Sequence, residues 1–244
     1  MLAKNEALRI RHALESLPPS LAKLVVDARS TDDTVAVARA AGARVIERDW
    51  DDFVSARTFA LANVETPWAL MIDADERADP VLRRALAAFE PADAVDAYRV
   101  RRMTVFCGRV VRACGWSNEP IVRLVRRGHV TLEARPAAGG SAALHERWVP
   151  ARGGVETLPG TLVHESYADR ASYAAKFDRY TSIEAASLQS TPRRLAFELA
   201  TSALRFVYWM LLHGAYRDGW RGWYVTFWSA AYPSVVHAKA LRRR

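Results

Sequence analysis

Residues 68–76 read Trp-Ala-Leu-Met-Ile-Asp-Ala-Asp-Glu, and this stretch decides how the chain folds. Its first five residues form a short apolar run, which is typical of a strand covered on both faces. Asp73 ends the run and Asp75 follows in the turn. Ligands bind at the carboxyl ends of strands in open α/β sheets, and hard divalent cations prefer oxygen donors. The two carboxylates are therefore candidate metal ligands, although a D-x-D triplet alone is also common in solvated turns.

Helices and strands alternate ahead of this stretch. In chain order we expect an amphipathic helix over residues 5–17, a strand over 24–27, a helix over about 33–41, a strand over 43–46 and a helix over 55–64. Leu8, Leu14 and Leu17 are the expected core positions of the first helix. The alternation predicts a parallel sheet with crossover helices. The strand that ends in Asp27 would place this carboxylate on the same edge as Asp73.

Motifs along nearly the whole chain resemble one known family. In the first half they are Lys4-Asn5-Glu6, Val25-Val26-Asp27 with residues 30–34, residues 41–45, Phe53 to Ala60 and Leu70 to Glu76. In the second half they are Gly115-Trp116, Val122-Arg123-Leu124, His145-Glu146, Leu162 to Tyr167, Tyr173 to Phe177 with Tyr180-Thr181, and Asp218-Gly219-Trp220-Arg221-Gly222. In order and spacing they resemble family 2 glycosyltransferases, which are inverting enzymes, and within these the lipopolysaccharide-core β-glycosyltransferases.

The resemblance implies an α/β chain with the GT-A fold, in which helices flank a Rossmann-like, mostly parallel sheet, and a C-terminal helical extension follows. It implies a glycosyltransferase domain over residues 1–170, with a nucleotide-sugar half over 1–96 and an acceptor half over 97–170. The helical extension would cover residues 171–244, which are rich in aromatic and basic side chains.

The resemblance also implies which residues bind the nucleotide-sugar. Lys4, Asn5 and Glu6 would line the pocket, and Asp27 would hydrogen-bond the uracil or the ribose. Arg57 stands where the family has a basic residue in the helix before the D-x-D, and it would contact the base or the diphosphate.

Catalytic roles follow in the same way. Asp73 would contact the ribose or a metal-bound water, Asp75 would bind Mg²⁺ or Mn²⁺ directly, and His164 would complete the metal or diphosphate site. A divalent ion stabilises the charge that develops on the leaving nucleoside diphosphate. Glu146 is the predicted general base, because the acceptor hydroxyl is a poor nucleophile until a carboxylate takes its proton. A single displacement of this kind inverts the anomeric centre.

Several of these residues have simpler structural explanations. Asp27 and Asp32 can cap a turn and a helix. Glu146 follows a histidine and can belong to a solvated loop, and His164 follows an apolar pair and can be a core histidine. Trp116 can stack on the acceptor or pack in the core.

Three positions depart from the family pattern. Arg29 stands where a glycine is usual, and a positive φ there would cost roughly 1 kcal/mol or more. Thr58 replaces an asparagine. Residues 1–3 are too short to complete the central apolar strand that the resemblance implies before Lys4, and we expect this to weaken the core and the nucleotide pocket.

The composition excludes several protein classes. Cys107 and Cys114 are the only cysteines, which indicates neither a disulfide framework nor a zinc site, and we expect them to be reduced. The net charge of +8 comes from residues 97–135 and 193–244, each with 9 basic and 2 acidic side chains. Neither segment contains a nucleic-acid recognition motif, so we do not expect a nucleic-acid partner.

The C-terminal segment favours contact with a membrane surface. Its uninterrupted apolar run, residues 206–212, is shorter than the about 20 residues that a bilayer span needs. Aromatic residues with flanking arginines suit the headgroup interface instead, although these helices could also pack on the catalytic domain or on a second subunit. With no signal peptide expected before Lys4, we predict a cytoplasmic protein that lies peripherally on the inner face of the cytoplasmic membrane.

Two functions from different classes follow. The first is a metal-dependent, inverting transfer of a sugar from a nucleotide-sugar, expected to be a UDP-sugar, to a lipopolysaccharide-core or lipid-linked glycan. The alternative is a catalytically silent, membrane-associated binding or scaffold protein derived from such an enzyme.

Overall fold

The computed structural model describes residues 1–113, 116, 119–134 and 146–243, and the chain divides into two compact units. Among the described residues, the first unit holds 1–102, 119–134 and 146–164, and the second holds 103–113, 116 and 165–243. Both units are therefore built from interleaved segments, whereas the domains predicted from the sequence were contiguous and divided after residue 170.

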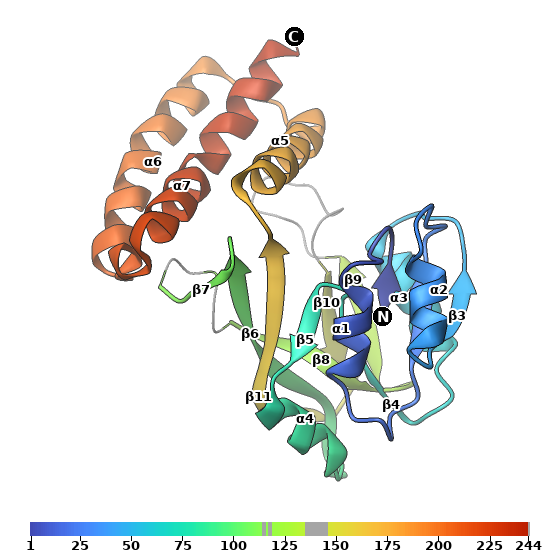
Figure 1. The fold of residues 1–244 in the computed structure, drawn as a ribbon. Helices are drawn as coiled ribbons and strands as arrows, with labels where there is room; N and C mark the ends of the chain where they lie inside the picture. The colour runs from blue at the N-terminus through green and yellow to red at the C-terminus, as the bar shows by residue number, and fades with distance from the viewer. Residues whose placement is uncertain (114–115, 117–118, 135–145, 244) are drawn as a thin grey trace. The chain divides into compact units, whose positions relative to one another are not determined.

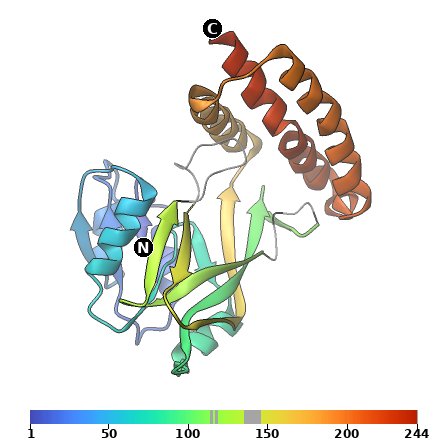
Figure 2. The same ribbon diagram turned by 180° about the vertical axis from the view of Figure 1, so that it is seen from behind.

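The N-terminal part of the first unit is a parallel sheet flanked by helices. Its strands are β1 (Leu2–Ala3), β2 (Leu24–Asp27) and β3 (Arg44–Glu47), which pair in this order. All pairs are parallel, with Leu2 opposite Val26 and Val25 opposite Val45. Helices α1 (Ile10–Glu15) and α2 (Thr34–Ala40) lie on one face (Figure 1), and α3 (Phe53–Ala62) lies on the other (Figure 2). This confirms the predicted α/β architecture.

Most of a second sheet belongs to the first unit, whereas β7 and the last residues of β6 and β11 belong to the second. Its strands follow the order β4-β8-β6-β11-β5, with β7 paired to β6. Their bounds are β4 (Trp68–Leu70), β5 (Glu76–Ala78), β6 (Val95–Phe106), β7 (Arg109–Val111), β8 (Glu119–Arg126) and β11 (Gly154–Tyr167). Helix α4 (Pro80–Ala87) follows β5, and β9 (Val130–Ala134) pairs with β10 (Glu146–Pro150) in a separate antiparallel ladder.

Strand β1 is short but central, as the family resemblance implies. Besides pairing with β2, its Leu2 forms an isolated parallel bridge with Asp73, directly beyond β4. Ala3 is buried, and the core of the unit continues through Val25 and Ile72. The carboxyl ends of β1, β2 and β4 therefore meet at one edge, because parallel strands end on the same side of a sheet.

The predicted helix over residues 5–17 forms only over Ile10–Glu15. Asn5 has a φ of 55°, in the left-handed region, where a right-handed helix cannot start. The expectation for Leu8 is wrong, since this residue lies outside the helix and is 91 % exposed. Leu14 and Leu17 are buried, as expected.

The second unit contains the predicted C-terminal helices. These are α5 (Arg170–Ser187), α6 (Pro192–Leu211), the 3₁₀ turn η1 (Ala215–Asp218) and α7 (Gly219–Arg242). Helices α6 and α7 lie side by side (Figure 1). No single helix within the described residues is long and apolar enough to cross a bilayer. Residues Pro192–Leu211 and Ala215–Arg242, bent by 74° where they meet, pass that length and composition criterion only as a pair.

The late D-G-x-x-G sequence joins α7 to the β6–β7 hairpin inside this unit. The Asp218 carboxylate accepts hydrogen bonds from the backbone N–H groups of Arg112 and Ala113. Arg221 donates from Nη2 to the carbonyl of Cys107 at 2.8 Å. A Cβ on Gly222 would lie 1.9 Å from the carbonyl oxygen of Ala215, so only glycine fits there. This family landmark therefore has a structural function.

Candidate active site

Asp73, the first carboxylate of the D-x-D, is held by two arginines from different elements. Arg57 on α3 donates to its Oδ1 at 2.7 Å, and Arg123 on β8 donates to its Oδ2 at 2.9 Å. Both arginine side chains are buried, whereas the Asp73 side chain is 28 % exposed. Burial works against the charged form, but the two guanidinium groups outweigh it and hold the pKa of Asp73 well below its ordinary value. Asp73 is therefore ionised and fixed in orientation.

Glu76 shares Arg123 with Asp73 and is completely buried. Arg123 donates to its Oε1 at 2.6 Å, and the Asp73 backbone N–H donates to its Oε2 at 3.2 Å. Burial raises the pKa of Glu76, and the charge of Arg123 opposes that rise. The pKa values of the two carboxyls are thus shifted in opposite directions. Glu76 therefore closes the turn by its hydrogen bond to the Asp73 backbone.

Asp75, the second carboxylate of the D-x-D, lies beside His164. His164 Nε2 is 3.1 Å from Asp75 Oδ2, and both side chains are more than four-fifths buried. Strand pairing brings them together, because β11 runs antiparallel to β5 with His164 opposite Glu76. The structure thus joins the two residues for which the sequence predicted a metal site.

An aspartate and a histidine in this arrangement fit one divalent cation. Ligand atoms at right angles on an ion with bonds of about 2.1 Å are about 3 Å apart, which matches the distance between Asp75 and His164. Within the described ranges, no cluster of three or more His, Cys, Asp or Glu side chains could hold a metal. Mg²⁺ is usually held by one or two carboxylates together with substrate phosphates, and a cation at this pair would follow that pattern.

The turn after β2 is organised by its own aspartate. Asp27 is fully buried, and its two oxygens accept hydrogen bonds from the backbone N–H and the hydroxyl of Ser30, at 2.7 and 2.6 Å. Asp32 accepts a bond from the Thr34 backbone N–H at 3.0 Å, at the start of α2. Asp27 thus caps the turn, and Asp32 binds the first backbone N–H of α2, although the N-cap position itself is Asp33. A contact between Asp27 and a nucleotide stays a prediction.

The segment after β1 packs against the same turn. Asn5 Oδ1 accepts a hydrogen bond from the Thr31 backbone N–H at 2.9 Å, and the Glu6 backbone N–H donates to Thr34 Oγ1 at 2.7 Å. Burial raises the pKa of Glu6; its partner Arg9 opposes this rise, and the charge of Asp75 adds to it. Glu6 therefore lies within electrostatic reach of the D-x-D. Lys4 is exposed.

Arg29, which replaces the usual glycine of this turn, has a φ of 52°. This is the left-handed conformation that the usual glycine at this position suggested. Arginine adopts it at a cost of about 1 kcal/mol or more. Its guanidinium group pairs with the exposed carboxylate of Asp49.

Two further predicted residues lie outside the group of side chains around the D-x-D. Glu146 begins β10 opposite Ala134, and its side chain lies outside the described part of the structure, as does His145. Trp116 packs in the second unit against Phe106, Tyr167 and Tyr173, with ring centroids 5.7–6.5 Å apart. This contact supports a core function for Trp116.

Arg123 and Glu76 were not predicted as site residues, although both lie within the motifs. A signal was present for Arg123, which interrupts the otherwise apolar strand segment Ile121–Val125. A buried charge in such a segment requires a partner. Which carboxylates it meets cannot be read from the sequence, because they lie about 50 positions away on another strand.

The sequence is similar to those of known glycosyltransferases. The model of the family described as glycosyl transferase family 2 matches residues 1–136. The lipopolysaccharide core biosynthesis glycosyltransferase LpsC of Rhizobium meliloti (strain 1021) is 27 % identical over 256 aligned residues, which cover 100 % of this chain and 91 % of LpsC. An uncharacterized glycosyltransferase of Rickettsia typhi is 26 % identical, over 86 % of this chain and 73 % of its own.

Solved structures give a more distant match. Glucosyl-3-phosphoglycerate synthase from Mycobacterium tuberculosis, crystallised with phosphoglyceric acid, is 18 % identical with a TM-score of 0.46. The match covers 67 % of this chain and 70 % of that one.

Proposed function

The chain belongs to glycosyl transferase family 2, whose model matches residues 1–136 of its 244, and from this premise we propose that it transfers a sugar from a UDP-sugar to a lipopolysaccharide-core or other lipid-linked glycan. The observation that carries the proposal is the Asp75–His164 pair beside the arginine-held Asp73, at the carboxyl edge of the sheet. Similarity to LpsC along the whole chain supports the choice of acceptor.

On the donor side, we assign the diphosphate to the Asp75–His164 pair and the ribose to Asp73. A divalent ion bound at the pair would supply Lewis-acid stabilisation of the leaving diphosphate. Each carboxylate oxygen accepts more than one hydrogen bond, so Asp73 can accept a ribose hydroxyl while Arg57 and Arg123 keep it in place. Its depressed pKa keeps this acceptor ionised throughout the neutral range.

On the acceptor side, we assign the general base to Glu146. Its carboxylate would take the proton of the acceptor hydroxyl as that oxygen forms the new bond to the anomeric carbon. The bond to the diphosphate breaks on the opposite face, so that one displacement inverts the centre and UDP leaves. We further propose that this takes place at the inner face of the cytoplasmic membrane, where lipid-linked glycans are accessible to the enzyme. The basic and aromatic C-terminal helices support this location.

The test is a transfer assay with purified protein, Mn²⁺, a panel of radiolabelled UDP-sugars and deacylated lipopolysaccharide core. We expect Mn²⁺-dependent release of UDP and labelling of the core with one donor of the panel. Glu146→Gln should reduce the rate by roughly 100-fold or more, the usual contribution of a positioned acid or base. Asp75→Ala should reduce it by at least about 10-fold, because it weakens the binding of the metal. Asp93→Ala, which removes an exposed carboxylate of the same unit, should retain the rate.

Calorimetric titration of UDP-sugars in saturating Mn²⁺ decides between the enzyme and the scaffold alternative. Failure of all donors to bind would exclude the transferase and favour the silent binding protein. Binding without transfer to the core would leave the donor assignment intact and reject this acceptor.

A further inference from the structure

Helix α6 exposes an apolar face where a surface helix normally exposes polar residues. Phe197, Leu204, Tyr208 and Leu211 are spaced by seven, four and three positions, which places them in one stripe along the helix. Leu204 is 70 % and Leu211 is 68 % exposed. We call this stripe the α6 apolar face. Monomeric soluble proteins rarely expose large contiguous apolar surfaces without an interaction partner.

The side of α6 that meets α7 contains polar groups as well as apolar ones. Ser202 Oγ lies 2.8 Å from Ser234 Oγ of α7. Glu198 is 2 % exposed and forms ion pairs with Arg194 and Arg205, each at 2.8 Å. Further along α6, Phe206 packs against Trp223 and Phe227 of α7, so α6 has apolar side chains on its outer side as well as on its packed side. A surface helix in water instead has polar residues along its outer side.

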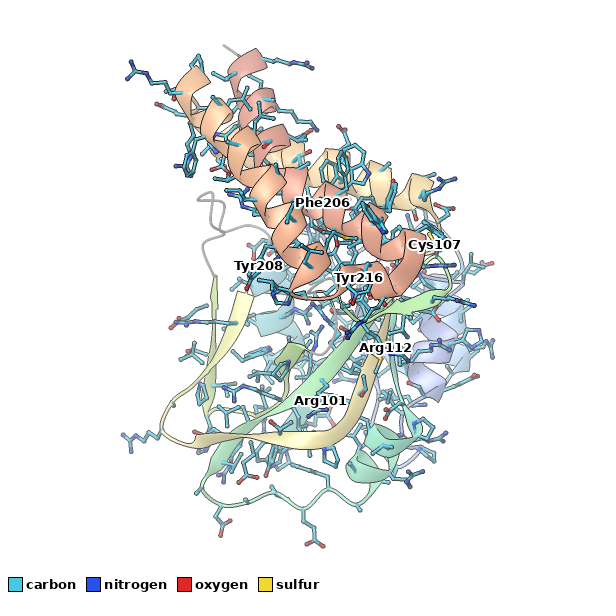
Figure 3. The ribbon with its side chains drawn as sticks, turned by 90° about the vertical axis from the view of Figure 1, so that its left-hand side faces the viewer. Arg101, Cys107, Arg112, Phe206, Tyr208 and Tyr216 are labelled. Atoms are coloured by element: carbon cyan, nitrogen blue, oxygen red, sulfur yellow. The ribbon has the colours of Figure 1, made fainter. Side chains whose placement is uncertain are left out.

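The exposed apolar surface continues beyond α6. Tyr216 in η1 and Trp220, Trp223 and Phe227 at the start of α7 are each about half exposed. Figure 3 shows Tyr208 near the end of α6 and Tyr216 in the turn beyond it. Tryptophan and tyrosine concentrate at the level of lipid headgroups, because their rings are apolar and one end is polar.

The charges beside this surface are of one sign. Residues 193–244 contain only two carboxylates. Glu198 is buried between two arginines, and Asp218 accepts hydrogen bonds from the backbone N–H groups of Arg112 and Ala113. The side chains of Arg112 and Arg217, on either side of Asp218, are exposed. The surface therefore presents apolar groups and cations to whatever covers it.

We propose that the α6 apolar face, together with the aromatic residues of η1 and the start of α7, lies in the headgroup layer of an anionic phospholipid bilayer. Arg112 and Arg217 contact the lipid phosphates. Binding to the bilayer needs neither donor nor acceptor; only its purpose, to bring the active unit to a lipid-linked glycan, rests on the proposed function.

Charge complementarity selects the bilayer over a second copy of the chain. A symmetric dimer through this face would place the arginines of both copies in one interface, where like charges are unfavourable. An anionic lipid surface attracts each of them. The aromatic residues at the ends of the helices also suit the interface of a bilayer.

Vesicle co-sedimentation of the full chain tests the proposal, with phosphatidylcholine vesicles with and without phosphatidylglycerol. We expect the chain to bind the anionic vesicles. Leu204→Glu combined with Leu211→Glu should weaken binding by more than about 10-fold. Arg112→Gln combined with Arg217→Gln should weaken binding to anionic vesicles by about 30-fold and leave the weak binding to neutral ones unchanged. Leu8→Glu, at an exposed leucine of the first unit, is the control and should bind like the wild type.

Fluorescence quenching by brominated lipids tests the same surface without introducing charged residues into α6. Brominated chains should quench the fluorescence of the wild type, and quenching should fall when Trp220 and Trp223 are both replaced by phenylalanine. Equal vesicle binding by the wild type and the Leu204→Glu, Leu211→Glu variant would overturn the proposal. So would a stable dimer, measured by light scattering without lipid, that this variant dissociates. Intact vesicle binding without any transfer would count against the proposed function alone.

Discussion

Arg123 on β8 donates a hydrogen bond to Asp73 at 2.9 Å, although the two residues are 50 positions apart. The same guanidinium group reaches Glu76 at 2.6 Å, so that one buried cation connects both ends of the D-x-D turn. The orientation of the turn therefore depends on a strand that the motif itself does not contain.

Removing this cation should destabilise the fold. Arg123→Met leaves the carboxylate of Glu76 buried without its partner, and we expect a loss of about 3–5 kcal/mol in the free energy of unfolding, measured by urea denaturation. Arg127→Met, at an exposed arginine just beyond the same strand, should change stability by less than about 0.5 kcal/mol. Equal effects of the two substitutions would show that the Arg123 bridge is not a stabilising feature.

The stability of the first unit should depend on pH through Asp73. Its folded pKa lies below its ordinary value of 3.8, so its ionised form stabilises the folded state in full above pH 4 and progressively less as the pH falls below it. Asp73→Asn should be less stable than the wild type by about 3 kcal/mol at pH 7, and the gap should narrow at pH 3. Urea denaturation at pH 7, 5 and 3 measures it, and a gap that stays constant with pH would contradict the ion pairing.

Metal affinity should depend on both members of the Asp75–His164 pair. In the presence of UDP, Asp75→Asn and His164→Gln should each lower the affinity for Mn²⁺ by at least about 10-fold, measured by electron paramagnetic resonance of free Mn²⁺. His12→Gln, at an exposed histidine of α1, is the control. Unchanged affinity in Asp75→Asn would remove Asp75 from the metal site.

The strained turn after β2 offers a stabilising substitution. Because residue 29 has a φ of 52°, Arg29→Gly should be more stable than Arg29→Ala by about 1 kcal/mol. Both variants lose the ion pair with Asp49, so thermal denaturation of the two isolates the backbone effect. A more stable alanine variant would mean that the turn relaxes out of the left-handed region.

Substitutions at Gly222 and Gly108 distinguish the cost of steric overlap from the cost of an unfavourable backbone conformation in the second unit. The Cβ of Gly222→Ala would overlap the carbonyl oxygen of Ala215, and we expect a loss of about 3 kcal/mol. Gly108 has a φ of 75° but open space around it, so Gly108→Ala should cost about 1 kcal/mol. Urea denaturation of both variants measures the difference. Comparable losses would mean that η1 moves away from α7 and relieves the overlap.

The sequence by itself determined the local architecture and the chemical class. The apolar run ahead of Asp73 and the alternation of helices and strands depend on interactions between near neighbours, and they predicted the α/β fold correctly. The motif order identified the family, and the need for a positive φ at Arg29 followed from the motif as well. The helix predicted over residues 5–17 is shorter in the structure. Asn5 has a left-handed conformation, and its side chain accepts a hydrogen bond from Thr31 in a turn that is distant in the sequence.

Only the tertiary structure decided which charges meet. Asp75 joins His164 because β11 runs antiparallel to β5, and Arg123 reaches Asp73 and Glu76 because β8 lies beside β4. The exposure of the α6 apolar face likewise depends on which side of the helix packs on α7. Sequence periodicity shows that a helix has an apolar side, but only the packing of neighbouring elements determines whether that side is buried in the protein or exposed.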